Sequence, residues 1–262
     1  MLKTLLLSMG LALLGGCGSS GGNGTPTQNP DPPPPGGAAA QVAILMMGNS
    51  HTSLNDLPRM VGAMVQAGSG KTTEVVVAPD WLSLQQRSQD AASLALLRSR
   101  PWRFVVLQAQ DYSSSGLFTY PIDGAMDLVA KARAAGALPI LFPEWPRKGI
   151  DETQRIYELH LSIARAAPAC VPPIPQSFDV AKARYPEIEL WAGDGNHSST
   201  AGAFLAAMII ATTMTGVTPD TLPVIPNTGI DAVMQAKLRS VAGETVRTTS
   251  TRTGCPGDAV GA

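Results

Sequence analysis

Short apolar segments alternate with longer amphipathic segments along the chain from Gln41 onward. Their periodicity predicts strands at 42–47, 74–78, 104–107 and 138–142, with a weaker one at 170–174. It predicts helices at 57–67, 86–99, 121–135, 151–166, 177–183 and 201–215. Strands that alternate with helices of this length indicate crossover connections and a parallel sheet. We therefore expect an α/β fold: a three-layer α/β/α sandwich with a mostly parallel sheet of about five strands.

The segment before this alternation has a different composition. Of the 24 residues from Cys17 to Ala40, 12 are Gly or Pro and none is a large apolar residue. Such a composition is typical of a flexible tether, which we place at residues 17–40. An apolar stretch at 5–14 follows Lys3 and is about half of the ~20 residues that a membrane-spanning helix needs. Residues 1–16 therefore fit a signal peptide.

The end of this signal peptide, Leu14-Gly15-Gly16-Cys17, resembles the lipobox of bacterial lipoproteins. The resemblance implies cleavage before Cys17 and lipidation of its sulfur and its new amine. Several acyl chains would anchor the protein to a membrane of the bacterial cell envelope, facing the periplasm or the exterior. The alternative is an ordinary signal peptide in which Cys17 happens to fall near the cleavage site. The working domain is expected at 41–245, and residues 246–262 lack periodicity and are expected to be a flexible tail.

The remaining cysteines, Cys170 and Cys255, could form a disulfide in an exported protein, although their separation in space does not follow from the sequence. Neither cysteine belongs to a cluster with metal-ligand spacing, so no metal is expected. The net charge of -1 argues against a nucleic-acid partner, which would normally require a basic surplus. We expect a monomer.

Candidate catalytic residues begin where the first predicted strand ends, at Gly48-Asn49-Ser50-His51-Thr52. Ligands of parallel α/β folds bind beyond the carboxyl ends of the strands, and Ser50 would stand there at the start of a helix. Backbone N–H groups at a helix start can stabilise an oxyanion. A Ser or Asn at such a turn can equally be a helix cap, so the assignment depends on a partner for Ser50.

The chain has three histidines that could activate a serine. His160 falls inside a predicted helix and is expected to be partly exposed there. His51 adjoins Ser50, but neighbouring side chains on a turn diverge, so it is expected to pack around the site. His197 follows Asp194 by three residues, which allows Asp194 to bind one imidazole nitrogen while the other faces the serine. The alternative is a capping acid beside a surface histidine.

Together, Gly48-Asn49-Ser50 and Asp194-Gly195-Asn196-His197 resemble the first and last sequence blocks of the SGNH (GDSL-type) hydrolase superfamily. The resemblance spans roughly 42–216 and implies a flavodoxin-like fold with Ser50 as nucleophile, His197 as base and Asp194 as its acidic partner. It implies hydrolysis of carboxylic esters without a metal or organic cofactor. It also implies an oxyanion hole, to which the backbone N–H of Ser50 would contribute.

The middle blocks of that superfamily are matched less well. The second block supplies a Gly N–H, but residues 78–83 contain no Gly, and Asp80 is one candidate donor in its place. The third block supplies an Asn side-chain amide, and Gln110 stands at the corresponding position, with Gln108 as a second candidate. Substrate contacts are expected from four residues around the site: Asn49, His51, Trp81 and Trp145. Glu144 could contact substrate hydroxyl groups.

These residues predict a serine esterase, with a short-chain or carbohydrate O-acetyl ester as the favoured substrate. A lipase, lysophospholipase or thioesterase of the same fold is an alternative. A non-catalytic lipoprotein that binds an envelope glycan or protein is the alternative from another class. The segment 68–72 contains the Gly-Lys-Thr of a phosphate-binding loop, but position 65 is Val and the segment precedes a strand, so this motif is excluded.

Overall fold

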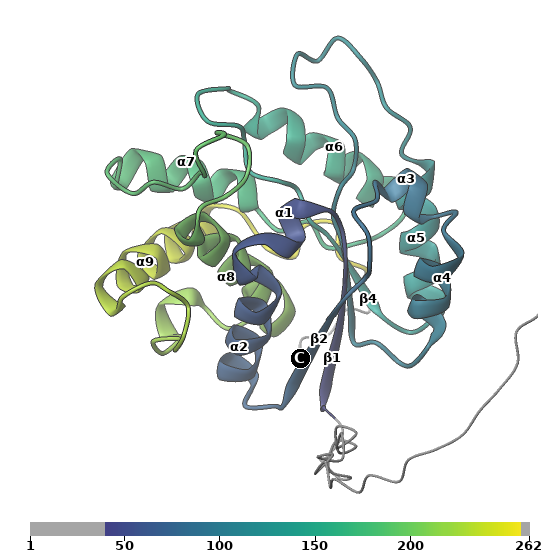
Figure 1. Ribbon diagram of the computed structural model, residues 1–262, viewed down its shortest axis with the longest axis horizontal. Helices are drawn as coiled ribbons and strands as arrows, with labels where there is room; N and C mark the ends of the chain where they lie inside the picture. Colours follow the sequence, from purple (N-terminus) through teal and green to yellow (C-terminus); the bar gives the residue numbers. More distant parts are fainter. Residues whose placement is uncertain (1–39, 258–262) are drawn as a thin grey trace, which may run out of the picture. The chain divides into compact units, whose positions relative to one another are not determined.

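The computed structural model describes residues 40–257, which include four parallel strands in one sheet (Figure 1). The strands are β1 (Val42–Met47), β2 (Thr73–Val77), β3 (Phe104–Leu107) and β4 (Leu138–Leu141), in the order β2-β1-β3-β4. All three neighbouring pairs are parallel. The expected α/β fold with a parallel sheet is therefore confirmed. The predicted signal peptide, Cys17 and all of the tether except Ala40 lie outside the described residues.

A fifth strand was expected at 170–174, and this prediction is wrong. Cys170 forms only an isolated bridge with Ile140, and the chain enters a helix at Ile174. The sequence between them contains Pro172 and Pro173, which have no N–H to donate to a neighbouring strand. The sheet therefore ends at β4, and the bridge continues it by one residue.

Helices cover both faces of the sheet because both faces are apolar. Alternate residues of β1 point in opposite directions: Ile44 and Met46 join one buried cluster, and Leu45 and Met47 join the other. Four helices contribute to the first cluster: α2 (Leu57–Ser69), α7 (Ile174–Arg184), α8 (Thr200–Thr215) and α9 (Ala232–Thr248). Four contribute to the second: α3 (Leu84–Arg87), α4 (Ala91–Arg98), α5 (Asp123–Ala134) and α6 (Thr153–Ala166). The short elements are α1 (Ser50–Ser53), η1 (Leu54–Asp56) and η2 (Pro219–Thr221).

Helix α8 is apolar on nearly all sides and lies in the core. Its first residue, Thr200, follows the segment that carries Asp194 and His197, and Ser199 caps it by accepting a hydrogen bond from the backbone N–H of Gly202. The rigid, buried helix therefore fixes the end of the segment that carries the candidate acid and base. No helix within residues 40–257 has both the length and the apolar character that crossing a membrane requires.

Two regions of helix differ from the sequence prediction. The single helix expected at 86–99 is divided into α3 and α4, because Asp90 accepts a hydrogen bond from the backbone N–H of Ser93 and so begins a new helix. Helix α9 was not expected, although Leu238, Val241 and Ala242 form a buried stripe along it. The tail expected from residue 246 is wrong for its described part, since α9 continues to Thr248.

The segment after α9 is attached to the domain by covalent and hydrogen bonds. Cys255 forms a disulfide with Cys170, 85 residues earlier in the chain. The backbone N–H of Val171 donates to the carbonyl of Thr253 at 2.9 Å. The pairing of Cys170 and Cys255 that the sequence left open is thus present, and it connects the end of the chain to the segment beside β4.

His160 on α6 is buried, with 2% of its surface exposed, so the expectation of a partly exposed residue is wrong. Its Nδ1 lies 2.8 Å from the carbonyl oxygen of Ile156, one helical turn earlier. Because burial penalises the charged imidazolium, the pKa of His160 falls from its ordinary value near 6.5 to about 4. The side chain is therefore neutral at pH 7.

This buried imidazole should make the protein less stable in mild acid. Between pH 6.5 and pH 4 the unfolded chain binds a proton at His160 and the folded chain does not, so stability falls as pH falls. The pKa difference corresponds to a loss of about 3 kcal/mol in the free energy of unfolding. We expect His160→Leu to remove this part of the decrease, as measured by urea unfolding at pH 7 and pH 4. Equal pH dependence of the parent and the variant would contradict this expectation.

Candidate active site

Ser50 is the first residue of α1, at the carboxyl end of the central strand β1. The turn from strand to helix requires Gly48, because a Cβ there would collide with side-chain atoms of Thr52 and Gln108. Asn49 caps α1 by accepting a hydrogen bond at Oδ1 from the backbone N–H of His51 at 2.9 Å. The predicted role of cap therefore belongs to Asn49, which leaves the Ser50 hydroxyl available for another partner.

That partner is His197. The hydroxyl oxygen of Ser50 lies 2.9 Å from Nε2 of His197, although 147 residues separate them in the sequence. On the other side of the same ring, Nδ1 lies 2.5 Å from Oδ2 of Asp194. The structure thus brings together all three residues predicted for the catalytic triad, in a continuous series of hydrogen bonds.

The turn that carries Asp194 holds its carboxylate in one orientation. Oδ1 of Asp194 accepts hydrogen bonds from the backbone N–H groups of Asn196 and His197, each at 2.9 Å. Gly195 adopts a φ of 69°, a left-handed conformation that glycine adopts readily. The hydrogen bond with the His197 side chain, assisted by the two backbone donors, lowers the pKa of Asp194 below its ordinary range. Asp194 is therefore a carboxylate whenever His197 acts as a base.

Two side chains connect this turn to the rest of the molecule. Nδ2 of Asn55, on η1, donates to the carbonyl of Ser198 at 2.7 Å. The indole N–H of Trp145 donates to the carbonyl of Asn196 at 2.8 Å. Trp145 was expected to contact substrate, but only 2% of it is exposed and its ring stacks on Phe178. Trp145 therefore supports the turn through its indole N–H, while its apolar ring packs in the core.

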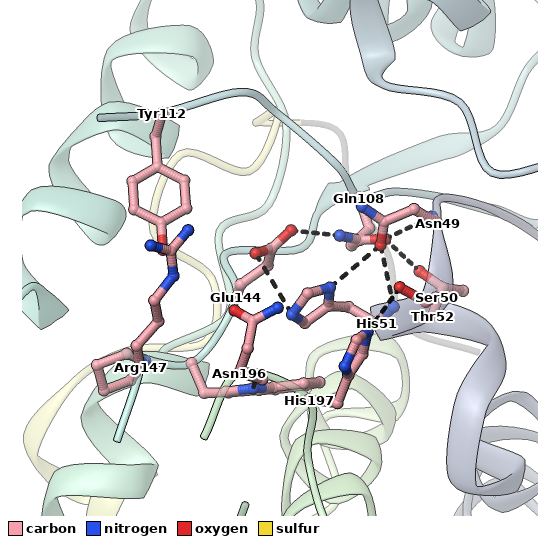
Figure 2. Close-up of polar contacts among 12 residues, drawn as sticks. Asn49, Ser50, His51, Thr52, Gln108, Tyr112, Glu144, Arg147, Asn196 and His197 are labelled. Carbon is pink, nitrogen blue, oxygen red and sulfur yellow. Dashed lines mark hydrogen bonds and ion pairs between the residues drawn. The ribbon is translucent and has the colours of Figure 1, made fainter. Parts of the chain in front are cut away.

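A second polar group, formed by His51, Gln108 and Glu144, lies beside the triad (Figure 2). The ring of His51 stacks on that of His197 with 4.9 Å between centroids, and its Nε2 lies 4.0 Å from Oε2 of Glu144. Oε1 of Gln108 accepts from the backbone N–H of Asn49 and from the Thr52 hydroxyl, both at 2.8 Å. Its Nε2 donates to Glu144. These contacts fix the turn at residues 48–52, which carries the candidate nucleophile Ser50 and is called the nucleophile turn below. They also fix the ring of His51, on which the ring of His197 stacks.

The predicted side-chain donors to an oxyanion are already committed to protein acceptors. Nε2 of Gln110 donates to the carbonyls of Asp111 and Pro121, both at 3.0 Å, which uses both of its hydrogens. Gln110 therefore shapes its own loop, and its predicted role as oxyanion donor is wrong for this arrangement. Gln108 accepts hydrogen bonds from the nucleophile turn and binds Glu144, so it too differs from the predicted role.

The backbone N–H groups predicted for the oxyanion hole remain suitable candidates. Ser50 stands at the first position of α1, where a helix leaves its N–H groups without an intrahelical acceptor. Asp80 has a φ of 63°, in the left-handed region that a glycine would adopt easily. Asp80 thus has the backbone conformation that would favour a Gly, the residue that the second sequence block of SGNH hydrolases has and this chain lacks. The oxyanion roles of Ser50 and Asp80 stay predictions.

Arg87 on α3 connects the nucleophile turn to the loop that contains Asp80. Its side chain is fully buried. It donates to the carbonyls of Gly48 at 2.9 Å, Asp80 at 2.8 Å and Pro79 at 3.2 Å. Burial lowers the pKa of Arg87, and the carboxylates of Asp90 and Asp80 oppose that effect. Sequence reasoning missed this residue because a single arginine in an amphipathic helix is normally exposed.

A pocket of about 340 Å³ opens beside the triad. Its walls include Asn49, His51 and Trp81, three of the four residues predicted to contact substrate. Trp81 is 62% exposed and therefore offers most of its ring to a ligand. Tyr112 and Glu144 also line the pocket, and burial together with the charge of Glu144 raises the pKa of Tyr112, which keeps its hydroxyl protonated.

Most of the remaining pocket surface is polar. Arg147 and Asn196 contribute to it (Figure 2), and the guanidinium of Arg147 lies 5.9 Å from the centre of the Tyr112 ring. Among the residues that the structure describes, no group of three or more His, Cys, Asp or Glu side chains could hold a metal ion. The pocket therefore offers hydrogen-bond donors and acceptors, an aromatic ring and the nucleophile turn to a small ligand.

No protein-family model matches the chain, and no curated protein matches it significantly. Solved structures that are similar to it include the following two. A candidate SGNH hydrolase from Slackia heliotrinireducens is 28% identical, with a TM-score of 0.55, over 66% of this chain and 98% of that one. A DUF4886 family protein from Bacteroides uniformis is 17% identical, with a TM-score of 0.57, over 79% of this chain and 95% of that one. These similarities agree with the α/β fold expected from the resemblance to SGNH hydrolases.

Proposed function

We propose that the protein is a serine esterase whose nucleophile is Ser50. The observation that carries this proposal is the series of hydrogen bonds from Ser50 through His197 to Asp194. A serine hydroxyl is a weak nucleophile until an adjacent base can take its proton, and an imidazole held by a carboxylate is such a base. The similarity to a candidate SGNH hydrolase supports the same reaction class.

In the proposed reaction, Nε2 of His197 accepts the proton of Ser50 as Oγ attacks the ester carbonyl. Asp194 stabilises the resulting imidazolium. The tetrahedral intermediate collapses, the C–O bond to the alcohol breaks, and His197 returns the proton to the departing alkoxide. Water then attacks the acyl-enzyme with His197 again as base, which releases the carboxylic acid and restores Ser50.

Backbone donors are the best candidates for stabilising the oxyanion in both steps. The N–H of Ser50 and an N–H of the loop around Asp80 lie on the two segments that Arg87 joins. Donors that are already oriented before substrate binds need no reorganisation during the reaction. We therefore assign the oxyanion hole to these backbone groups in place of Gln110.

We further propose that the substrate has a short acyl group attached to a hydroxyl-rich alcohol, because the pocket beside Ser50 is small and mostly polar. Its polar walls can bind sugar hydroxyl groups, and Trp81 can stack on a sugar ring. A long acyl chain would instead require an extended apolar channel. We propose a carbohydrate O-acetyl ester as the substrate. The lipobox-like sequence ending at Cys17 supports a lipid-anchored location in the bacterial cell envelope.

Covalent labelling tests the proposed nucleophile. Diisopropyl fluorophosphate should bond to Ser50 Oγ with loss of fluoride, because His197 activates this hydroxyl. We expect a stoichiometric mass increase on the peptide that contains Ser50, together with loss of p-nitrophenyl acetate hydrolysis. Substrate hydrolysis that continues after complete labelling, or labelling confined to other residues, would contradict the proposal.

A further inference from the structure

The pocket of about 340 Å³ beside the triad is called the reactive pocket below. A second hollow, of about 260 Å³, lies next to it. The two hollows adjoin, because Asp111 and Tyr112 line both of them. Phe118 and Tyr120 line the second hollow as well. These residues belong to the long connection between β3 and α5, which rises above the carboxyl edge of the sheet (Figure 1).

The tip of this connection has a defined shape. The backbone N–H groups of Gly116 and Phe118 donate to the carbonyl and the hydroxyl of Ser113, at 3.1 and 3.3 Å. Gly116 adopts a φ of 74°, which a side chain would disfavour. Arg155 on α6 donates to the carbonyl of Ser114. A tip that is ordered before binding loses little conformational entropy when a ligand arrives.

Exposed aromatic rings line both hollows. Trp81, in the reactive pocket, is 62% exposed, and Phe118 and Tyr120, in the second hollow, are 71% and 42% exposed. Aromatic side chains that are exposed around a hollow can serve as stacking surfaces for a ligand. A stretch of connected sugar rings that contacts Trp81 in the reactive pocket and continues past Asp111 and Tyr112 would meet Phe118 and Tyr120.

The chemistry of the second hollow fits sugar better than lipid. Phe118 and Tyr120 offer flat apolar faces, on which the C–H face of a sugar ring can stack. Asp111, Ser113 and Arg155, which line the same hollow, can bind hydroxyl groups. An acyl chain would place hydrocarbon against the carboxylate of Asp111 and the guanidinium of Arg155, which is unfavourable.

We propose that the second hollow is a glycan subsite, which binds the sugar units that adjoin the acylated unit in the reactive pocket. The natural substrate is then an acylated oligosaccharide or polysaccharide, bound over several units. This inference rests on the proposed function and extends it from the ester to the chain that carries it. Phe118 supplies the principal stacking surface of the subsite.

Binding of oligosaccharides of different length tests the subsite. The Ser50→Ala protein, which should not cleave its ligand, is titrated calorimetrically with O-acetylated xylose and with O-acetylated xylotetraose. We expect the tetrasaccharide to bind at least about tenfold more tightly, and Phe118→Ala in the same background to remove most of this gain. Equal affinity for the two ligands, or a gain that survives Phe118→Ala, would overturn the proposal.

Leu117 provides a matched control. It is 80% exposed and adjoins Phe118, but it does not line the hollow, so Leu117→Ala should leave tetrasaccharide binding unchanged. If both substitutions weaken binding equally, or if the parent binds phosphatidylglycerol vesicles through Leu117 and Phe118 but not the tetrasaccharide, a general apolar contact replaces the glycan subsite. Failure of the esterase proposal is recognised separately, by the absence of Ser50-dependent hydrolysis, since these titrations need no catalysis.

Discussion

Ser50→Ala is expected to abolish ester hydrolysis, with kcat lower by on the order of 10⁴-fold or more. The variant loses only the hydroxyl that lies 2.9 Å from His197. No acyl-enzyme can form without it, so what remains is attack by water on an ester oriented by the pocket. The measurement is steady-state hydrolysis of p-nitrophenyl acetate, with circular dichroism to confirm that the fold is retained.

Ser53→Ala is the matched control for this experiment. This substitution also removes one serine hydroxyl from α1. The hydroxyl of Ser53 donates to the carbonyl of Asn49 at 3.1 Å and is not the one that binds His197. The kcat of this variant should remain within a few-fold of the parent. Equal activity of Ser50→Ala and the parent would remove the esterase assignment. Equal loss in both serine variants would show that the helix, and not the nucleophile, had been damaged.

Asp194→Asn is expected to lower kcat by on the order of 10⁴-fold while leaving the structure of the turn intact. Asn retains a carbonyl oxygen that can accept from the backbone N–H groups of Asn196 and His197. Its NH₂ group then faces Nδ1 of His197, which must act as an acceptor. The imidazole proton moves to Nε2, so that this nitrogen can no longer take the proton of Ser50.

The effect should fall mainly on kcat, because Asp194 does not line the pocket that would hold substrate. Asp151→Asn, at an exposed position before α6, serves as the control for the loss of one negative charge. Comparable kcat values for Asp194→Asn and Asp151→Asn would contradict the role of Asp194 in orienting the base.

The sequence predicted those features that depend on local pattern and chain order. Periodicity predicted the buried runs that form β1 and β3. It also placed Ser50 after the first strand and His197 before the helix that begins at Thr200. The three-residue spacing of Asp194 and His197 was enough to predict that they share one turn. The pairing of Ser50 with His197 needed the resemblance to a known arrangement, since 147 residues separate them.

Features that depend on the packing of distant segments could not be predicted in this way. Trp145 is buried because its ring stacks on Phe178, which lies on a distant helix. His160, in contrast, lies four residues after Ile156 and three before Ile163, so the helical period of the apolar residues does indicate its burial. Gln110 matched a donor by position, but Pro121 and Asp111 take both of its amide hydrogens. The sequence does not distinguish Arg87 from an exposed helix residue, because its three carbonyl partners lie in other segments.

Those three carbonyl groups have a consequence for how sequences of this type can change over time. The carbonyl groups of Gly48, Pro79 and Asp80 share one guanidinium, whose loss would leave the buried carbonyl of Gly48 and the part-buried carbonyls of Pro79 and Asp80 without this donor. Lysine could not replace it, because a single ammonium lacks the planar fork that reaches separate acceptors. A relative without an arginine at position 87 would also need a different conformation of the loop that contains Pro79 and Asp80. Position 87 should therefore tolerate little change, even though Arg87 takes no part in the proposed proton transfers, whereas positions 79 and 80 can change more freely, because every residue type supplies a main-chain carbonyl.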